Sequence, residues 1–227
     1  MSDVVLPDSL ILTPSALAPI PSRVNLAVFA SGTGTNFRAI CEAARSGLLD
    51  VAEPMLLVCN RDCPAMQIAE EFGVPAMVIS PKDFETAEAW MAAITDQLHA
   101  YEIDFVALAG FLRIVGPPLL DAFENRILNL HPALLPAYPG LHSIEHIWRD
   151  AHGSDETLAR EARDAAGVTV HLIDSGMDTG PVLRQGAIDL DQFGSVEDFE
   201  AAVHALEHEL FPAVIADFAR NFSSDKE

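Results

Sequence analysis

The sequence predicts a single α/β domain with a mostly parallel, twisted sheet of about seven strands flanked by helices. Short apolar runs alternate along the chain with stretches of helical spacing, the order typical of strand–helix–strand units. The apolar runs are nearly continuous, as expected for strands that helices cover on both faces. The chain has 227 residues, half of them hydrophobic, and can therefore bury a sizeable core.

The first half of the chain predicts alternating strands and helices. Strands are expected over Val24–Ala30, Pro54–Cys59, Ala76–Ile79 and Asp104–Ala109. Helices are expected over Phe37–Ser46, Ala65–Phe72 and Asp83–Tyr101. Gly73 directly follows the second of these helices and is a typical helix stop.

The second half of the chain is less regular. A short helix (Pro118–Phe123), a strand (Arg126–Leu130) and a Pro-rich loop lead to a helix over Ser143–His152. A charged segment, Gly153–Ala166, follows without an assigned element. The chain then predicts strands over Gly167–Ile173 and Val182–Ile188, and a long helix over Val196–Phe218. Residues 1–22 are expected to form a flexible arm, 23–220 the domain and 221–227 a polar tail.

The charge balance restricts the class of partner. The chain carries 13 Lys and Arg against 34 Asp and Glu, a net charge of -21, which argues against a nucleic-acid partner. A small anionic substrate stays possible, because one local pocket can attract one phosphate. The first 22 residues lack Lys and Arg, and no apolar run is long enough for a membrane span. We therefore expect a cytoplasmic protein.

The cysteines give no metal signal. The chain has three, Cys41, Cys59 and Cys63, an odd number that fits a reducing compartment. Cys59 and Cys63 have no second Cys or His pair nearby, so small buried thiols are the expected state.

The turn Ser31–Asn36 reads SGTGTN between an expected strand and helix. Backbone N–H groups of such a turn, with a helix N-terminus behind them, bind phosphate. The third glycine position of a dinucleotide fingerprint is Phe37, and no Gly-Lys-Ser/Thr follows, so a monophosphate is favoured over NAD or ATP. A plain tight turn with Asn36 as a helix cap is the alternative.

Two further motifs carry polar groups suited to acyl chemistry. Asn129 and His131 point to the same side of a strand and lie where it ends, so they could hold a carbonyl oxygen as it becomes an oxyanion. Asp178, in a turn-rich loop, could accept a proton or hold an imidazolium. A satisfied strand-end pair and an Asx-type loop are the structural alternatives, and Asp174 fits the second better than Asp178 does.

In this order the motifs resemble the formyltransferase family that uses 10-formyltetrahydrofolate. The resemblance covers about Val24 to Phe218 and implies a Rossmann-like formyltransferase fold. It is carried by SGTGTN, LAGFLRIV (Leu108–Val115), NLHPALLPAYPGLH (Asn129–His142), GVTVH (Gly167–His171) and MDTGP (Met177–Pro181).

The resemblance implies roles for particular residues. Asn129, His131 and Asp178 match the catalytic groups: the first two would stabilise the oxyanion, and Asp178 would stabilise the imidazolium and organise removal of the amine proton. The substrate phosphate and ribose would be held by Gly34, Thr35, Asn36 and Glu207. The folate would be held by Arg113, Ile114, Val115, Asp174 and Met177. Thr169 and His171 would support the site from an inner strand.

The implied activity is transfer of the formyl group of 10-formyltetrahydrofolate to the amine of glycinamide ribonucleotide in purine biosynthesis, without a metal. We expect small-molecule substrates and a monomer or homodimer. Ala137 stands where a basic residue is common, and His204 where a polar phosphate contact is usual, so the acceptor stays open. The alternatives are another small amine, such as an amino sugar nucleotide, and, more distantly, an NAD-binding oxidoreductase.

Overall fold

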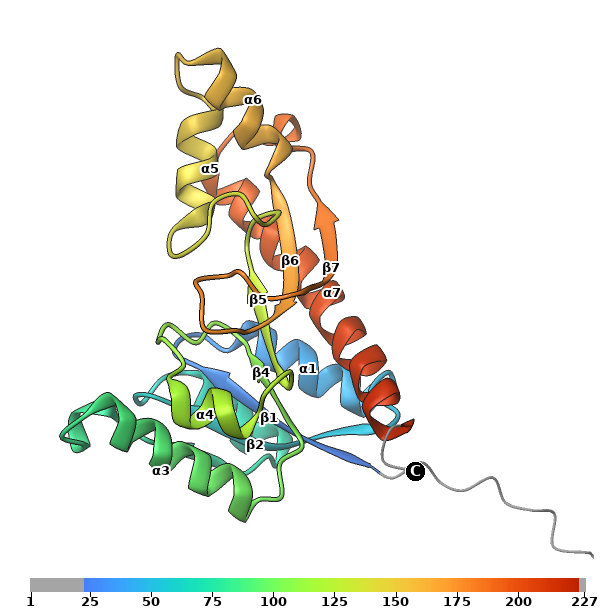
Figure 1. The fold of residues 1–227 in the computed structure, drawn as a ribbon. Coiled ribbons are helices and arrows are strands. Elements are labelled where there is room, and N and C mark those ends of the chain that lie inside the picture. Colours follow the sequence, from blue (N-terminus) through green and yellow to red (C-terminus); the bar gives the residue numbers. More distant parts are fainter. Residues whose placement is uncertain (1–22, 225–227) are drawn as a thin grey trace, which may run out of the picture.

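The computed structural model describes residues 23–224 and contains one seven-stranded sheet in the order β3-β2-β1-β4-β5-β6-β7 (Figure 1). The strands from β3 to β5 are parallel, and β6 and β7 are added antiparallel, which confirms a mostly parallel α/β sheet. The bounds are β1 (Val24–Ala30), β2 (Ala52–Cys59), β3 (Ala76–Val78), β4 (Phe105–Leu108), β5 (Ile127–His131), β6 (Gly167–Leu172) and β7 (Val182–Ala187). The arm expected over 1–22 lies outside the described residues.

Helices cover both faces of this sheet and close two apolar cores (Figure 1). α3 and α4 pack on one face, and α1, α2, α5 and α7 contribute to the core on the other. The helices are α1 (Thr35–Ser46), α2 (Ala65–Phe72), α3 (Ala87–Ala100), α4 (Pro117–Ala122), α5 (Ser143–Ala151), α6 (Glu156–Asp164) and α7 (Val196–Ser224). Two 3-10 turns, η1 (Pro81–Asp83) and η2 (Leu190–Gln192), complete the elements.

Three helical expectations need correction. The helix expected over Asp83–Tyr101 begins only at Ala87, because Thr86 is extended and its hydroxyl caps α3 by accepting from the Ala89 N–H at 3.1 Å. The charged segment Gly153–Ala166 contains α6, which Asp155 caps in the same way. α7 continues to Ser224 and so includes part of the expected tail 221–227.

The carboxyl ends of the parallel strands bring the motifs to one edge of the sheet. The strands β1, β4 and β5 are neighbours in the sheet, so the turn after β1, the loop after β4 and the end of β5 lie at the same edge. The strand order reverses at β1, and such a reversal is the usual position of a ligand site in sheets of this kind. Antiparallel pairing then sets Asn129 opposite His171 and His131 opposite Thr169. Strand register thus fixes which β6 side chains face the end of β5.

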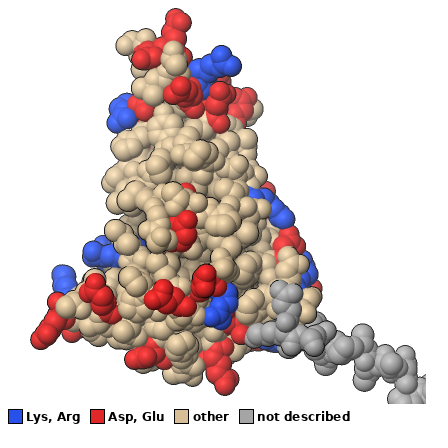
Figure 2. Space-filling view, in the orientation of Figure 1, with Lys and Arg blue, Asp and Glu red and all other residues tan. Residues whose placement is uncertain are grey.

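Acidic side chains are unevenly distributed over one face of the molecule. In the view of Figure 2 most of them lie over α3 and α4 and around α6, and a smaller acidic patch stands in the middle of the face within a largely uncharged area.

The Gly34 position gives a test of the turn. Gly34 has φ +76°, and a Cβ there would lie 2.7 Å from the Ala65 Cβ. We expect Gly34→Ala to lower the free energy of unfolding by about 2–5 kcal/mol, because left-handed strain adds to the overlap with α2. Urea unfolding followed by circular dichroism measures this loss.

Gly47→Ala is the matched control. Gly47 has φ +83°, but apart from Gly47 itself and its two chain neighbours no heavy atom of the described residues lies within 4 Å of the position that an added Cβ would take. Only the left-handed strain remains, about 1–2 kcal/mol. Equal losses in the two variants would contradict the close packing of Gly34 against α2.

Candidate active site

The end of β5 carries a cluster of four polar side chains. Asp178 lies between two imidazoles: its Oδ2 is 3.5 Å from His131 Nδ1, and its Oδ1 is 3.6 Å from His171 Nε2. His171 Nε2 is in turn 3.1 Å from Asn129 Nδ2. The structure therefore brings together all three residues expected at the catalytic centre, and adds His171 as the link between Asn129 and Asp178.

The His131 ring is fixed from both sides. Its Nε2 lies 2.8 Å from the carbonyl oxygen of Tyr138, and because a carbonyl only accepts, Nε2 carries a proton. Any further proton therefore arrives at Nδ1, facing Asp178. Burial lowers the pKa of His131 below its ordinary 6.5, while the Asp178 charge and the Tyr138 carbonyl oppose that shift. The resting ring is neutral near pH 7, with its protonation site already beside a carboxylate.

Asp178 is held as a carboxylate. Contact with the His171 ring is the largest cause that lowers its pKa, and the Gly140 N–H, which donates to Oδ2 at 2.8 Å, adds to it, as does the charge that His131 carries when it is protonated. Partial burial acts in the opposite direction. Asp178 itself adopts φ +54°, in the left-handed region. The loop thus accepts backbone strain to aim this side chain at the two imidazoles.

His171 fixes the orientation of the Asn129 amide. His171 Nδ1 lies 2.8 Å from the Leu172 carbonyl and so carries the proton, which leaves Nε2 to accept from Asn129 Nδ2. An amide nitrogen has two hydrogens, so one is engaged here and the other can point to a ligand. His171 is 1% exposed, so its ring contacts these protein groups and not solvent.

The turn after β1 forms a second polar spot. Gly34 is the N-cap of α1, and no side-chain cap bond is formed there among the described residues. Asn36 is not the helix cap considered as an alternative: its Nδ2 donates to Glu207 Oε2 at 2.8 Å. Asn36 Oδ1 is buried and has no hydrogen-bond partner within residues 23–224. Thr35 is exposed in the first turn of α1.

Glu207 closes this second spot from α7. It is only 6% exposed, and burial raises the pKa of its carboxyl group, with the Asn36 bond and the His204 charge acting against that shift. A buried carboxylate beside a helix N-terminus is suited to accept hydroxyl hydrogens from a sugar.

The residues expected to hold folate divide into two kinds. Arg113 is exposed, Ile114 is 84% exposed and Met177 is 64% exposed, so these side chains can cover an apolar ligand. Val115 is instead 7% exposed and packs in the α3/α4 core, so only its backbone can reach a ligand. Asp174 forms an Asx turn, accepting from Gly176 N–H at 2.9 Å and Thr179 Oγ at 2.7 Å.

Thr169 supports the site from inside. Its fully buried hydroxyl donates to the Ala133 carbonyl at 2.6 Å and accepts from the Leu135 N–H at 3.0 Å. It therefore anchors the Pro-rich loop that begins directly after His131.

Two groups of that loop contribute although sequence reasoning did not single them out. Tyr138 supplies the carbonyl that holds His131, and its phenol donates to Asp150 Oδ2 at 3.1 Å, fixing the loop to α5. Gly140 supplies the N–H that binds Asp178. Both lie in the string PAYPGLH, but they hold His131 and Asp178 through backbone atoms, which leave no residue-type signal.

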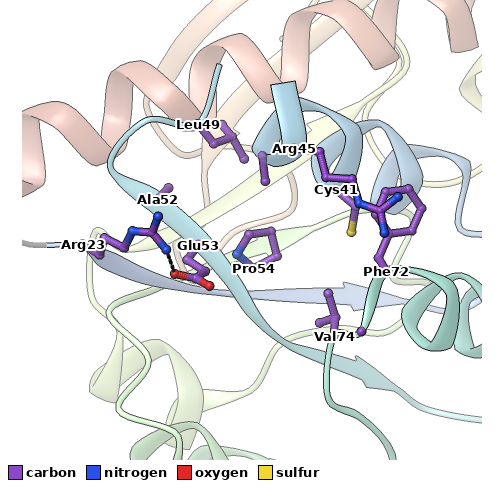
Figure 3. Close-up of a pocket in the computed structure, with 11 residues that line it drawn as sticks. Arg23, Cys41, Arg45, Leu49, Ala52, Glu53, Pro54, Phe72 and Val74 are labelled. Carbon is purple, nitrogen blue, oxygen red and sulfur yellow. Dashed lines mark hydrogen bonds and ion pairs between the residues drawn. The ribbon is translucent and has the colours of Figure 1, made fainter. Parts of the chain in front are cut away.

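A separate hollow lies at the opposite edge of the sheet (Figure 3). Its volume is about 240 Å³, and residues at the start of β2 and at the ends of α1 and α2 line it. Its cations are engaged: Arg23 pairs with Glu53, and the Arg45 guanidinium lies 4.0 Å from the centroid of the Phe72 ring. This hollow is not part of the candidate site.

Within residues 23–224, no group of three or more His, Cys, Asp and Glu is arranged to hold a metal ion. None of the helices in the same range combines the length and the apolar character that a bilayer crossing requires.

Comparisons with known proteins agree with the fold of the chain. A family model described as "Formyl transferase" matches residues 24–215. A phosphoribosylglycinamide formyltransferase of Bacillus subtilis (strain 168) is 40% identical over 83% of this chain and 91% of its own length. One from Mycobacterium tuberculosis is 37% identical over 88% of this chain and 87% of its own. The crystal structure of glycinamide ribonucleotide transformylase 1 from Geobacillus kaustophilus superposes with TM-score 0.78 at 43% identity, covering 87% of this chain and 99% of that one.

Replacement of the central carboxylate tests the electrostatics of the cluster. Asp178 raises the pKa of His131, so Asp178→Asn removes a charge that favours the imidazolium and the pKa of His131 should fall below its wild-type value. Titration of the histidine ring resonances by NMR measures this directly. An unchanged or raised pKa of His131 in the variant would contradict the pairing of the two groups.

Proposed function

This chain belongs to the formyl transferase family, and we propose that it transfers the formyl group of 10-formyltetrahydrofolate to the amine of glycinamide ribonucleotide in purine biosynthesis. The observation that carries the proposal is the polar cluster of Asn129, His131 and Asp178 at the edge where the turn after β1 also lies. β1 and β5 are separated by β4 alone, so the two spots are roughly 10 Å apart at the usual strand spacing.

The turn after β1 binds the ribonucleotide in this proposal. The phosphate accepts backbone N–H groups of Gly34 and Thr35 at the N-terminus of α1, whose first turn carries no acidic residue. Asn36, with its unpartnered Oδ1, and Glu207 receive the ribose hydroxyls. The acidic net charge of the chain is compatible with this anion site, because one local pocket can still attract one phosphate.

The folate lies against Arg113, Ile114 and Val115, with the loop of Asp174 and Met177 on its other side. The exposed apolar side chains of Ile114 and Met177 are suited to cover a flat ring, and the backbone of Val115 can bond its polar edge. This placement directs the formyl group toward the end of β5.

The chemistry needs stabilisation of charge on the formyl oxygen. The amine attacks the formyl carbon, a new C–N bond forms, and the bond to the folate nitrogen breaks as that nitrogen takes up a proton. Asn129 donates its second amide hydrogen to the developing oxyanion. His131 donates from Nε2, where the oxyanion takes the place of the Tyr138 carbonyl. The ring is charged in the transition state because its Nδ1 takes up the proton that the attacking amine gives up, and this proton is passed on to the leaving folate nitrogen.

Asp178 serves the proton transfers. Its Oδ2 faces His131 Nδ1, so it stabilises the imidazolium that forms there. It also organises removal of the proton that the attacking amine gives up, directly or through water. The exchange is balanced, since the amine loses one proton and the leaving nitrogen gains one. His171 and Thr169 hold the participants in place.

We further propose that the enzyme acts in the cytoplasm as a monomer or homodimer, on small molecules and not on nucleic acid. The excess of acidic residues supports the last point.

The direct test is an assay of formyl transfer from 10-formyltetrahydrofolate to glycinamide ribonucleotide, followed by tetrahydrofolate absorbance. An amino sugar nucleotide serves as the second acceptor. Transfer to the ribonucleotide alone supports the proposal. Transfer to the amino sugar nucleotide alone would show that the proposed acceptor is wrong.

Loss of the His131 imidazole should affect chemistry more than folding. We expect His131→Ala to lower kcat by about 10²–10³-fold, the usual loss for one oxyanion donor, with a circular dichroism spectrum like that of the wild type. His146→Ala, which removes an exposed imidazole from α5, is the matched control and should retain full activity. Wild-type turnover in His131→Ala would remove His131 from the mechanism.

Replacement of Glu207 should weaken the binding of glycinamide ribonucleotide and leave the binding of the folate unchanged. Glu207→Gln keeps the shape but replaces a charged acceptor by a neutral one, so KM for glycinamide ribonucleotide should rise about 10-fold while kcat changes little. Because burial already raises the pKa of Glu207, the neutral side chain should not destabilise the fold. Steady-state kinetics with each substrate varied measures both constants, and the exposed Glu209→Gln is the control.

A further inference from the structure

Ser31 lies between the end of β1 and the glycine turn, and it is 1% exposed. It is a polar residue buried at the junction of two segments that the proposed function assigns to different substrates. One is its own turn, which leads into the ribonucleotide site. The other is the loop 109–116 after β4, which carries the folate residues.

Three hydrogen bonds connect Ser31 to its surroundings. Its N–H donates to the Gly110 carbonyl at 3.1 Å, and its Oγ accepts from the Leu112 N–H at 3.0 Å. Its carbonyl accepts from Arg61 Nε at 2.7 Å. Two of the three bonds therefore join the glycine turn directly to the folate loop.

Burial of side chains holds the ends of the folate loop more than its middle. Phe111 and Val115 are buried and anchor it at 9% and 7% exposure, but between them the side chains of Leu112 and Ile114 are 60% and 84% exposed. Packing therefore fixes the ends of this stretch and not its centre. The bond from Leu112 N–H to Ser31 Oγ holds the backbone directly before Arg113.

We propose that Ser31 is a positioning residue that couples the two substrate sites, so that a ribonucleotide bound at the glycine turn strengthens folate binding. A phosphate on the turn holds Ser31 in place, and Ser31 then holds Leu112 and the backbone of the folate loop. By thermodynamic linkage the folate must strengthen ribonucleotide binding by the same factor. The inference rests on the proposed function, since it needs both ligands at their assigned places.

Calorimetric titration measures the coupling. Tetrahydrofolate and glycinamide ribonucleotide form a suitable pair, because without a formyl group no turnover occurs. We expect the ribonucleotide to lower the Kd of tetrahydrofolate for the wild type by about fivefold, the equivalent of one ordinary hydrogen bond. In Ser31→Ala this factor should approach one, while the Kd of the ribonucleotide alone stays within about twofold, since its backbone donors remain.

Two variants make the test specific. Arg61 is exposed and donates the third bond, to the Ser31 carbonyl. Arg61→Ala removes this bond and should retain the coupling factor, because the bond from Leu112 to Ser31 is intact. Ser31→Cys fills the same buried space with a weak acceptor, so it should lose coupling as the alanine variant does. It also keeps the test valid if alanine at this buried position prevents folding.

The outcomes separate the two proposals. Wild-type protein that binds neither ligand would overturn the proposed function. Wild-type protein that binds both without coupling, or a Ser31→Ala or Ser31→Cys variant with the wild-type factor, would overturn the role of Ser31 alone.

Discussion

The candidate site depends on one arrangement, a carboxylate held between two buried imidazoles. A charged group at that depth is costly unless every polar neighbour is matched to it. Here the Gly140 N–H donates to Asp178, which lies between the two rings, and backbone carbonyls fix the protonated nitrogen of each ring. The chemistry proposed for the site follows from this matching, because it decides which nitrogen gains a proton and which amide hydrogen is left for a ligand.

The sheet supplies the frame for that arrangement. The parallel strands deliver the glycine turn, the folate loop and the end of β5 to one edge, and the antiparallel β6 returns His171 and Thr169 beside them. A slip of one residue between β5 and β6 would turn these side chains to the other face. The buried Thr169 hydroxyl, bonded to both Ala133 and Leu135, therefore ties register and loop position together.

The sequence predicted the elements that have a local residue pattern. It did not predict features that depend on backbone atoms or on residues far away in the chain. Apolar runs placed the strands within a few residues, and the period of two placed Asn129 and His131 on one side. α6 was missed because only Ala159 and Ala162 are buried on it, too narrow an apolar face among charges. Tyr138 and Gly140 act through backbone atoms. The partner of Asn36 is 171 positions away, beyond any local pattern.

The phenol of Tyr138 extends the site further than its ligands reach. It bonds Asp150 on α5, and α5 packs against α6 at the narrow end of the molecule, while the carbonyl of the same residue fixes the His131 ring. One aromatic residue therefore joins α5 to the imidazole of His131. A substitution on α5 that displaced Asp150 would remove the bond that holds the other end of this residue.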